Sequence, residues 1–223
     1  MATRRAGYFV TGTDTGVGKT LVSQILLHQL RREYARVAGF KPVASGCEMT
    51  PEGLRNSDAL ALQRASSIAL AYATVNPYAF APAVAPHLAA AAVGVRIDCA
   101  QIAAGIEAVA ADARVVEGVG GWLVPLNRHE TVADLAVRLG LPVVLVVGLR
   151  LGCLNHALLT VESMRRRAVP IAGWVANQIE PALPWLNGNL DALETRLGLP
   201  LLLSLPWHAH PPDPAAWAFR RPG

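Results

Sequence analysis

Short apolar runs alternate along the chain with longer segments in which apolar side chains recur at helical spacing. The short runs are rich in β-branched residues and lie at 8–11, 37–41, 115–117, 143–148, 171–176 and 201–205. The longer segments lie at 19–33, 58–64, 99–111, 131–139, 155–167 and 186–197. This alternation predicts an α/β fold, a parallel sheet with helices on both of its faces. The continuous apolarity of residues 143–147 is typical of a central strand.

Two parts of the chain interrupt this pattern. Three prolines punctuate an alanine-rich stretch between residues 72 and 95, which predicts a long excursion with one short helix. The tail from Pro211 onward is expected to be irregular. A length of 223 residues fits one large domain or two small ones, and the 52% hydrophobic content is ample for one core, so we expect a single domain over residues 1–223.

The first apolar run leads directly into a glycine-rich loop, Gly12-Thr13-Asp14-Thr15-Gly16-Val17-Gly18-Lys19-Thr20. Such a loop brings backbone N–H groups close to a polyphosphate, while Lys19 adds positive charge and the Thr20 hydroxyl can bind Mg²⁺. The helix that follows points its positive end at the phosphates. A glycine-rich turn without chemical consequence is the alternative, but the strand before and the helix after the loop favour nucleotide binding.

Chemically active side chains also follow the next strands, where ligands of parallel sheets bind. Lys41 ends the second run. It is either a solvated lysine or a second ammonium that holds a transferring phosphoryl group and its acceptor together. Glu117 comes directly after buried valines, which is costly unless a cation offsets its desolvation. Asp58 is either a helix-start residue beside a cap at Asn56 or Ser57, or a metal ligand.

The later strands end in further candidates. Asn155 lies near a helix start, where free N–H groups attract a carboxylate, although it could simply cap the helix. The amide of Asn177 could face an adenine, and the residues after the last strand could wrap around a base. We interpret Cys153 as a small buried residue and His156 as a packed one.

Composition excludes several classes of protein. The net charge is +4, and the short arginine runs have no interleaved aromatic residues, so we expect no nucleic-acid groove. Three distant cysteines without a C-x-x-C pair argue against a disulfide framework or a zinc site and suit a reducing cytoplasm. The apolar run at 139–149 is too short to span a bilayer, and no targeting segment precedes the phosphate loop. We therefore expect a soluble cytoplasmic protein without membrane contact.

These segments together resemble the dethiobiotin synthetase family, ATP-dependent enzymes of biotin biosynthesis within the P-loop NTPase superfamily. The similarity covers nearly the whole chain, at 8–15, 18–20, 41–46, 50–60, 73–78, 117–118, 120–122 and 172–177. The lysine segment and the Asn76-Pro77-Tyr78 segment are more specific to this family than the phosphate loop, which many NTPases share.

The resemblance implies a cyclo-ligase that uses ATP, CO₂, Mg²⁺ and 7,8-diaminopelargonate. One amine of the substrate adds to CO₂ as a carbamate, ATP phosphorylates a carbamate oxygen, and the second amine closes the ureido ring. The products are dethiobiotin, ADP and phosphate. The resemblance also implies a homodimer in which the partner subunit completes each substrate site.

The same resemblance assigns roles to individual residues. Lys19 and Lys41 would be the catalytic cations, and Ser45 would contact the substrate near its amines. Cys153, Leu154 and Asn155 would receive the substrate carboxylate from across the dimer. Mg²⁺ would be held by Thr20, Asp58 and Glu117. ATP would be bound by Gly16, Val17, Gly18, Lys19, Thr20, Leu21, Asp58, Glu117, Gly118, Val119, Gly120, Asn177, Gln178, Pro206, Trp207, His208 and Asp213. Gln178 and the histidines after Pro206 depart from the family pattern around the base.

Three other functional interpretations are alternatives to the dethiobiotin synthetase resemblance. A partitioning ATPase shares the fold, but such proteins carry a second lysine in the phosphate loop where this chain has Asp14. An amidotransferase synthetase would need a glutaminase domain, and too few residues follow the last strand to form one. A degenerate nucleotide-binding module would have lost Lys19, Thr20 or an acidic metal ligand, and the chain retains all of them.

Overall fold

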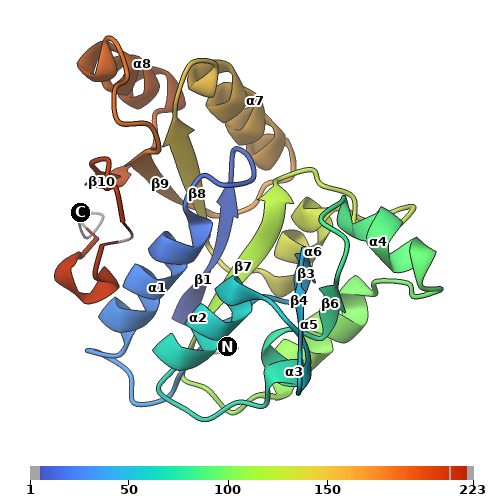
Figure 1. Cartoon of the computed structure of the whole chain (residues 1–223). Coiled ribbons are helices and arrows are strands. Elements are labelled where there is room, and N and C mark those ends of the chain that lie inside the picture. The colour runs from blue at the N-terminus through green and yellow to red at the C-terminus, as the bar shows by residue number, and fades with distance from the viewer. Residues whose placement is uncertain (1–5, 211, 220–223) are drawn as a thin grey trace.

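A computed structural model describes residues 6–210 and 212–219. Its main feature is a six-stranded sheet in the order β10-β9-β8-β1-β7-β2 (Figure 1). The strands are β1 (Ala6–Gly12), β2 (Val37–Phe40), β7 (Ala113–Gly121), β8 (Val143–Leu149), β9 (Ile171–Gln178) and β10 (Leu201–Leu205). All five neighbouring pairs run parallel, which confirms the predicted parallel sheet and its six strands.

Helices cover both faces of this sheet, as the alternation predicts (Figure 1). On one face lie α1 (Lys19–Leu30) and α2 (Ser57–Ala65). On the other lie α5 (Cys99–Ala108), α6 (Val132–Leu139), α7 (Cys153–Arg166) and α8 (Leu186–Leu197). The central strand β8 is buried on both sides, because Val144 packs toward α1 and Leu145 packs toward the opposite layer.

The excursion contains more structure than the single short helix we expected. It holds α3 (Tyr72–Val75), β6 (Tyr78–Phe80) and α4 (Pro86–Ala92). Strand β6 pairs with β3 (Val43–Ser45), while β4 (Glu48–Thr50) and β5 (Gly53–Arg55) form a small hairpin. Strands of three residues carry too little periodicity to be recognised in the sequence.

Asn76 connects this excursion to the main sheet. Its buried amide Nδ2 donates to the Lys41 carbonyl at 2.7 Å, and its Oδ1 accepts from the Tyr72 hydroxyl at 2.9 Å. The same hydroxyl accepts from the backbone N–H of Asn56, the residue that caps α2 through Ala59 N. This hydrogen-bond network therefore holds in place the backbone at residue 41 and at the start of α2, where residue 58 lies.

Several element ends differ from those predicted. Strand β7 continues past residue 117 to Gly121, because the register of β1 with β7 extends as far as the pair Gly12 and Gly121. Helix α7 begins at Cys153, two residues earlier than expected, and α1 ends at Leu30 rather than at residue 33. The described part of the tail is irregular except for the turn η1 (Pro214–Ala216), and residues 211 and 220–223 lie outside the described residues.

Asp134 stabilises the start of α6. Its Oδ2 accepts from the backbone N–H and the hydroxyl of Thr131 at 2.7 and 2.6 Å, and its Oδ1 pairs with Arg167 at 2.6 Å. Partial burial on its own would raise the pKa of Asp134, but the Thr131 hydrogen bonds and the Arg167 charge lower it below the ordinary value. A carboxyl whose folded pKa is lowered stabilises the fold above its unfolded pKa and loses that contribution as the pH falls.

We expect Asp134→Ala to lower the free energy of unfolding by about 1 kcal/mol at pH 7, the usual cost of losing a helix-start hydrogen bond. The deficit relative to the original protein should shrink as the pH falls below about 4, where an unfolded aspartate protonates. Urea unfolding followed by circular dichroism at pH 7 and at lower pH measures both values. Glu162→Ala removes the exposed pair with Arg166 on α7 and serves as the control, with an expected cost of only about 0.3–0.5 kcal/mol. An equal loss in both variants would contradict the assignment.

All three cysteines are free and buried. Burial, reinforced by the neighbouring Glu130 carboxylate, raises the pKa of the Cys99 thiol to about 12.

Within residues 6–210 and 212–219, every helix is too short or too polar to cross a membrane.

Candidate active site

The phosphate loop joins β1 to α1 at the carboxyl end of the sheet. Gly18 immediately precedes α1 with a φ of 92°, a left-handed conformation that favours glycine. The Lys19 ammonium folds back over the loop and donates to the Asp14 carbonyl at 2.7 Å. The loop therefore has a glycine in a conformation that allows a tight turn, and its lysine lies against the loop backbone.

Lys41 lies at the centre of a buried ionic cluster. Its Nζ is 2.6 Å from Glu117 Oε1 and 3.0 Å from Asp58 Oδ2, and it also donates to the Gly118 carbonyl. The clustering follows from the sheet, because Phe40 of β2 pairs with Val116 of β7 and the next residues lie side by side. Lys41 is only 4% exposed, so the alternative of a solvated surface lysine is wrong.

These contacts set the charges of the cluster. Burial on its own would lower the pKa of Lys41, but the Glu117 and Asp58 carboxylates outweigh it and raise the pKa, which keeps the ammonium charged. Burial on its own would raise the pKa of Asp58, but the Lys41 charge outweighs burial and lowers this pKa. Burial and the Lys41 charge lower the pKa of Lys19 to about 8, because they outweigh the opposite effect of the Glu117, Asp58 and Asp14 carboxylates.

Oxygen atoms suited to a divalent cation gather beside Lys41. The Thr20 hydroxyl donates to Glu117 Oε1 at 3.1 Å. Glu117 Oε2 is buried and finds no hydrogen-bond partner among the described residues. Together with Asp58 these are hard oxygen donors, and Mg²⁺ takes one or two carboxylates while keeping water and phosphate oxygens in its shell. The residues therefore fit Mg²⁺.

One cavity of about 650 Å³ brings together the predicted catalytic lysines, the predicted metal ligands and part of the phosphate loop. Its predicted lining residues are Gly16, Gly18, Lys19, Thr20, Lys41, Ser45, Asp58, Glu117, Val119 and Gly120. The Ser45 hydroxyl is buried there and has no partner within the described part of the chain. Residues 83–86 and Val124 also line the cavity. The sequence pattern missed these residues because small apolar side chains in an irregular segment carry no motif.

Comparison with known proteins identifies the family. The family described as "AAA domain" matches residues 6–213. The "ATP-dependent dethiobiotin synthetase BioD" of Pseudomonas aeruginosa (strain UCBPP-PA14) is 54% identical over 202 residues, which cover 89% of each chain. The "ATP-dependent dethiobiotin synthetase BioD 1" of Escherichia coli (strain K12) is 50% identical over 211 residues, 94% of each chain. This chain belongs to the dethiobiotin synthetase family.

Solved structures share the fold of this member of the dethiobiotin synthetase family. A ParA family ATPase from Chlorobium tepidum TLS superposes with a TM-score of 0.55 at 13% identity, over 92% of this chain and 84% of the other. The signal recognition particle 54 kDa protein from Aeropyrum pernix K1 gives 0.51 at 14% identity, over 92% of this chain and 42% of the other. At such low identity the likeness shows the fold alone.

Other residues that the dethiobiotin synthetase resemblance implicates lie outside the lining of this cavity. The buried Asn177 amide donates to the Val17 carbonyl at 2.9 Å and so supports the phosphate loop, an interaction that the sequence did not signal. Gln178 donates to the Glu180 carbonyl, and Asp213 accepts from Ala215 N at the start of η1. The lining also does not include Val17, Leu21, Gly118, Pro206, Trp207 and His208.

The predicted carboxylate-binding residues begin α7. Gly152, in a left-handed conformation, occupies the position before the helix, and Cys153 is the first helical residue. Asn155 is the exposed third residue of α7, so the alternative that it caps this helix is wrong. Among the described residues that line the cavity, none comes from the start of α7.

Proposed function

We infer that this protein is an ATP-dependent dethiobiotin synthetase, a cyclo-ligase that joins 7,8-diaminopelargonate and CO₂. Family membership at about half identity over nearly the whole chain supports this activity. The observation that carries the mechanism is the buried ammonium of Lys41 between Glu117 and Asp58, in the same cavity as the phosphate loop.

The reaction needs charge stabilisation and positioning more than a protein nucleophile. One substrate amine adds to CO₂, and an oxygen of the resulting carbamate attacks the γ-phosphorus of ATP as ADP leaves. The second amine then attacks the carbonyl of this mixed anhydride, which releases phosphate and closes the ring. Lys19 and Lys41 neutralise the negative charges of the carbamate and of the phosphoryl group that moves to it from ATP. The Ser45 hydroxyl forms a hydrogen bond to the substrate near its amines.

Mg²⁺ bound by Thr20, Asp58 and Glu117 would offset the charge of the phosphate oxygens. The backbone N–H groups around Gly16 and Gly18 bind the remaining phosphate charge. Asn177, Gln178, Pro206, Trp207, His208 and Asp213 surround the adenine in this proposal, and the departures from the family pattern at these positions bear on base preference.

We also propose that the protein is a homodimer in which the start of α7 receives the substrate carboxylate of the partner's site. Within a single chain, α7 does not contribute its first turn to the cavity described above. Leu151, just before α7, is 96% exposed, and Leu123 and Leu159 are also exposed and line one shallow pocket. Sedimentation velocity that gives a monomer at enzyme concentrations used in assays would contradict this arrangement.

Three free thiols support a reducing compartment such as the cytoplasm.

A single assay tests the activity. Purified protein with Mg-ATP and bicarbonate should release phosphate only when 7,8-diaminopelargonate is added, and EDTA should abolish the release. An analogue that lacks one of the two amines is the matched control, because it cannot close the ureido ring. Hydrolysis that ignores the diamine and rises with DNA or lipid would instead favour a partitioning ATPase.

A further inference from the structure

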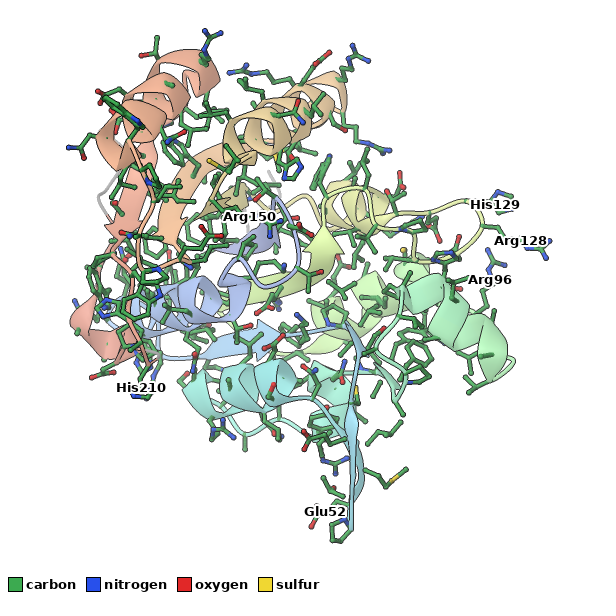
Figure 2. All side chains as sticks on the ribbon, turned by 45° about the horizontal axis from the view of Figure 1, so that its top comes forward. Glu52, Arg96, Arg128, His129, Arg150 and His210 are labelled. Carbon is green, nitrogen blue, oxygen red and sulfur yellow. The ribbon has the colours of Figure 1, made fainter. Side chains whose placement is uncertain are left out.

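An ion pair connects the phosphate loop to the turn that opens α7. Arg150 Nη2 pairs with Asp14 Oδ2, across 136 positions of sequence. Figure 2 shows Arg150 beside the loop that follows β1. The backbone also ties the phosphate loop to the strand that leads into this turn, since Thr13 N donates to the Val146 carbonyl of β8 at 3.0 Å.

The Asp14 end of this pair determines the shape of the phosphate loop. Asp14 Oδ1 accepts from the Thr15 backbone N–H at 2.7 Å, and the Asp14 carbonyl accepts from Lys19 Nζ at the same distance. One residue thus contacts Arg150, the loop backbone and the lysine that faces the phosphates. A rotation of the Asp14 side chain would break its contacts with Arg150 and Thr15 N, and a shift of its backbone would alter all three contacts.

The Arg150 end determines where α7 begins. The Arg150 carbonyl accepts from Cys153 N at 3.0 Å, and this bond closes the turn that contains the left-handed Gly152. The N–H groups of the first turn of α7 are the ones that the proposed function assigns to the substrate carboxylate. Arg150 therefore contacts the nucleotide loop through its side chain and the carboxylate-binding turn through its backbone.

We propose that Arg150 is a positioning residue that, through Asp14, holds the phosphate loop in its nucleotide-binding shape and links it to the start of α7. The side chains of Arg150 and Asp14 are 36% and 44% exposed, so the pair contributes little to folding stability and acts through geometry. The part of the proposal that concerns nucleotide binding stands on the contacts of the loop alone. The part that concerns α7 rests on the proposed function.

The Kd for Mg-ADP distinguishes a positioning role of Asp14 and Arg150 from a direct effect of their charges on the nucleotide. Asp14→Asn removes a negative charge beside the expected phosphates, so charge alone predicts tighter nucleotide binding. Positioning predicts that Asp14→Asn and Arg150→Gln each raise the Kd for Mg-ADP by roughly fivefold. The double variant should bind Mg-ADP no more weakly than either single variant, because the effects of substitutions within one network are not additive. Arg150→Lys should retain most of the affinity. Glu162→Gln, in an exposed pair on α7, is the control and should leave the Kd unchanged.

Isothermal titration with Mg-ADP, without the diamine, gives these values whether or not the proposed reaction is correct. Tighter binding by Asp14→Asn, or an unchanged Kd in Arg150→Gln, would overturn the proposal. Steady-state kinetics add the second readout, since Asp14→Asn should also raise the KM for the diamine. A raised Kd with an unchanged diamine KM would limit the role of Arg150 to the nucleotide and overturn the link to α7.

Discussion

Lys41→Ala should lower the turnover number by about a hundredfold to a thousandfold, the usual cost of removing one charged contact from a transition state. The expected loss follows from position, because the Lys41 ammonium is held between two carboxylates at the cavity rather than on the phosphate loop. The Kd for Mg-ADP should change little, since the loop and Lys19 remain. Phosphate release under saturating diamine, with titration of Mg-ADP alongside, checks both parts.

The same variant leaves Glu117 and Asp58 close together without a buried cation, and this carries a folding cost. Lys41→Arg controls for that cost, because it keeps the charge but cannot place a compact ammonium at the same point. Near-UV circular dichroism and ADP affinity show whether each variant is folded. Full turnover in a folded Lys41→Ala protein would remove Lys41 from the mechanism.

Gly18→Ala should abolish most nucleotide binding. A Cβ at this position would lie 2.2 Å from Asn177 Nδ2, which would have to leave the Val17 carbonyl, and its φ of +92° is strained for any other residue. Strain of this kind costs about 1–3 kcal/mol, and displacement of the loop adds to it, so the Kd for Mg-ADP should rise at least about tenfold.

Gly94→Ala is the matched control for this change. Gly94 also has a positive φ, of +67°, but an added Cβ would meet no atom within 4 Å. Both variants should lose stability from backbone strain, and only Gly18→Ala should lose nucleotide affinity. Equal ADP affinities in the two folded variants would show that the loop tolerates a side chain at residue 18.

The sequence predicted those parts of the fold and site that depend on long apolar runs and on strand ends. Six runs became six parallel strands, and Lys41 and Glu117 became neighbours because adjacent parallel strands end at one edge. Strands β3 to β6 were missed because each has three residues. The end of β7 was placed too early because glycines suggest a turn, whereas here the pairing with β1 continues as far as Gly121.

Side-chain contacts between distant segments could not be predicted in the same way. The sequence marks Asn177 as a polar residue at a strand end, which suits a base as well as it suits a carbonyl of the phosphate loop 160 positions earlier. It likewise shows Asp14 only as a difference from partitioning ATPases and gives no sign of its pairing with Arg150. Such contacts depend on loop geometry, which no periodicity encodes.

The three buried thiols make this protein its own reporter of motion. Cys47 lies beyond β3, Cys99 opens α5 and Cys153 opens α7, so each thiol lies beside a different element of the fold. Maleimide reagents react with exposed thiolates, and a thiol with a pKa near 12 inside a packed core reacts only when its surroundings open. The labelling rate at each cysteine therefore measures how often the structure around that thiol opens, without any engineered probe.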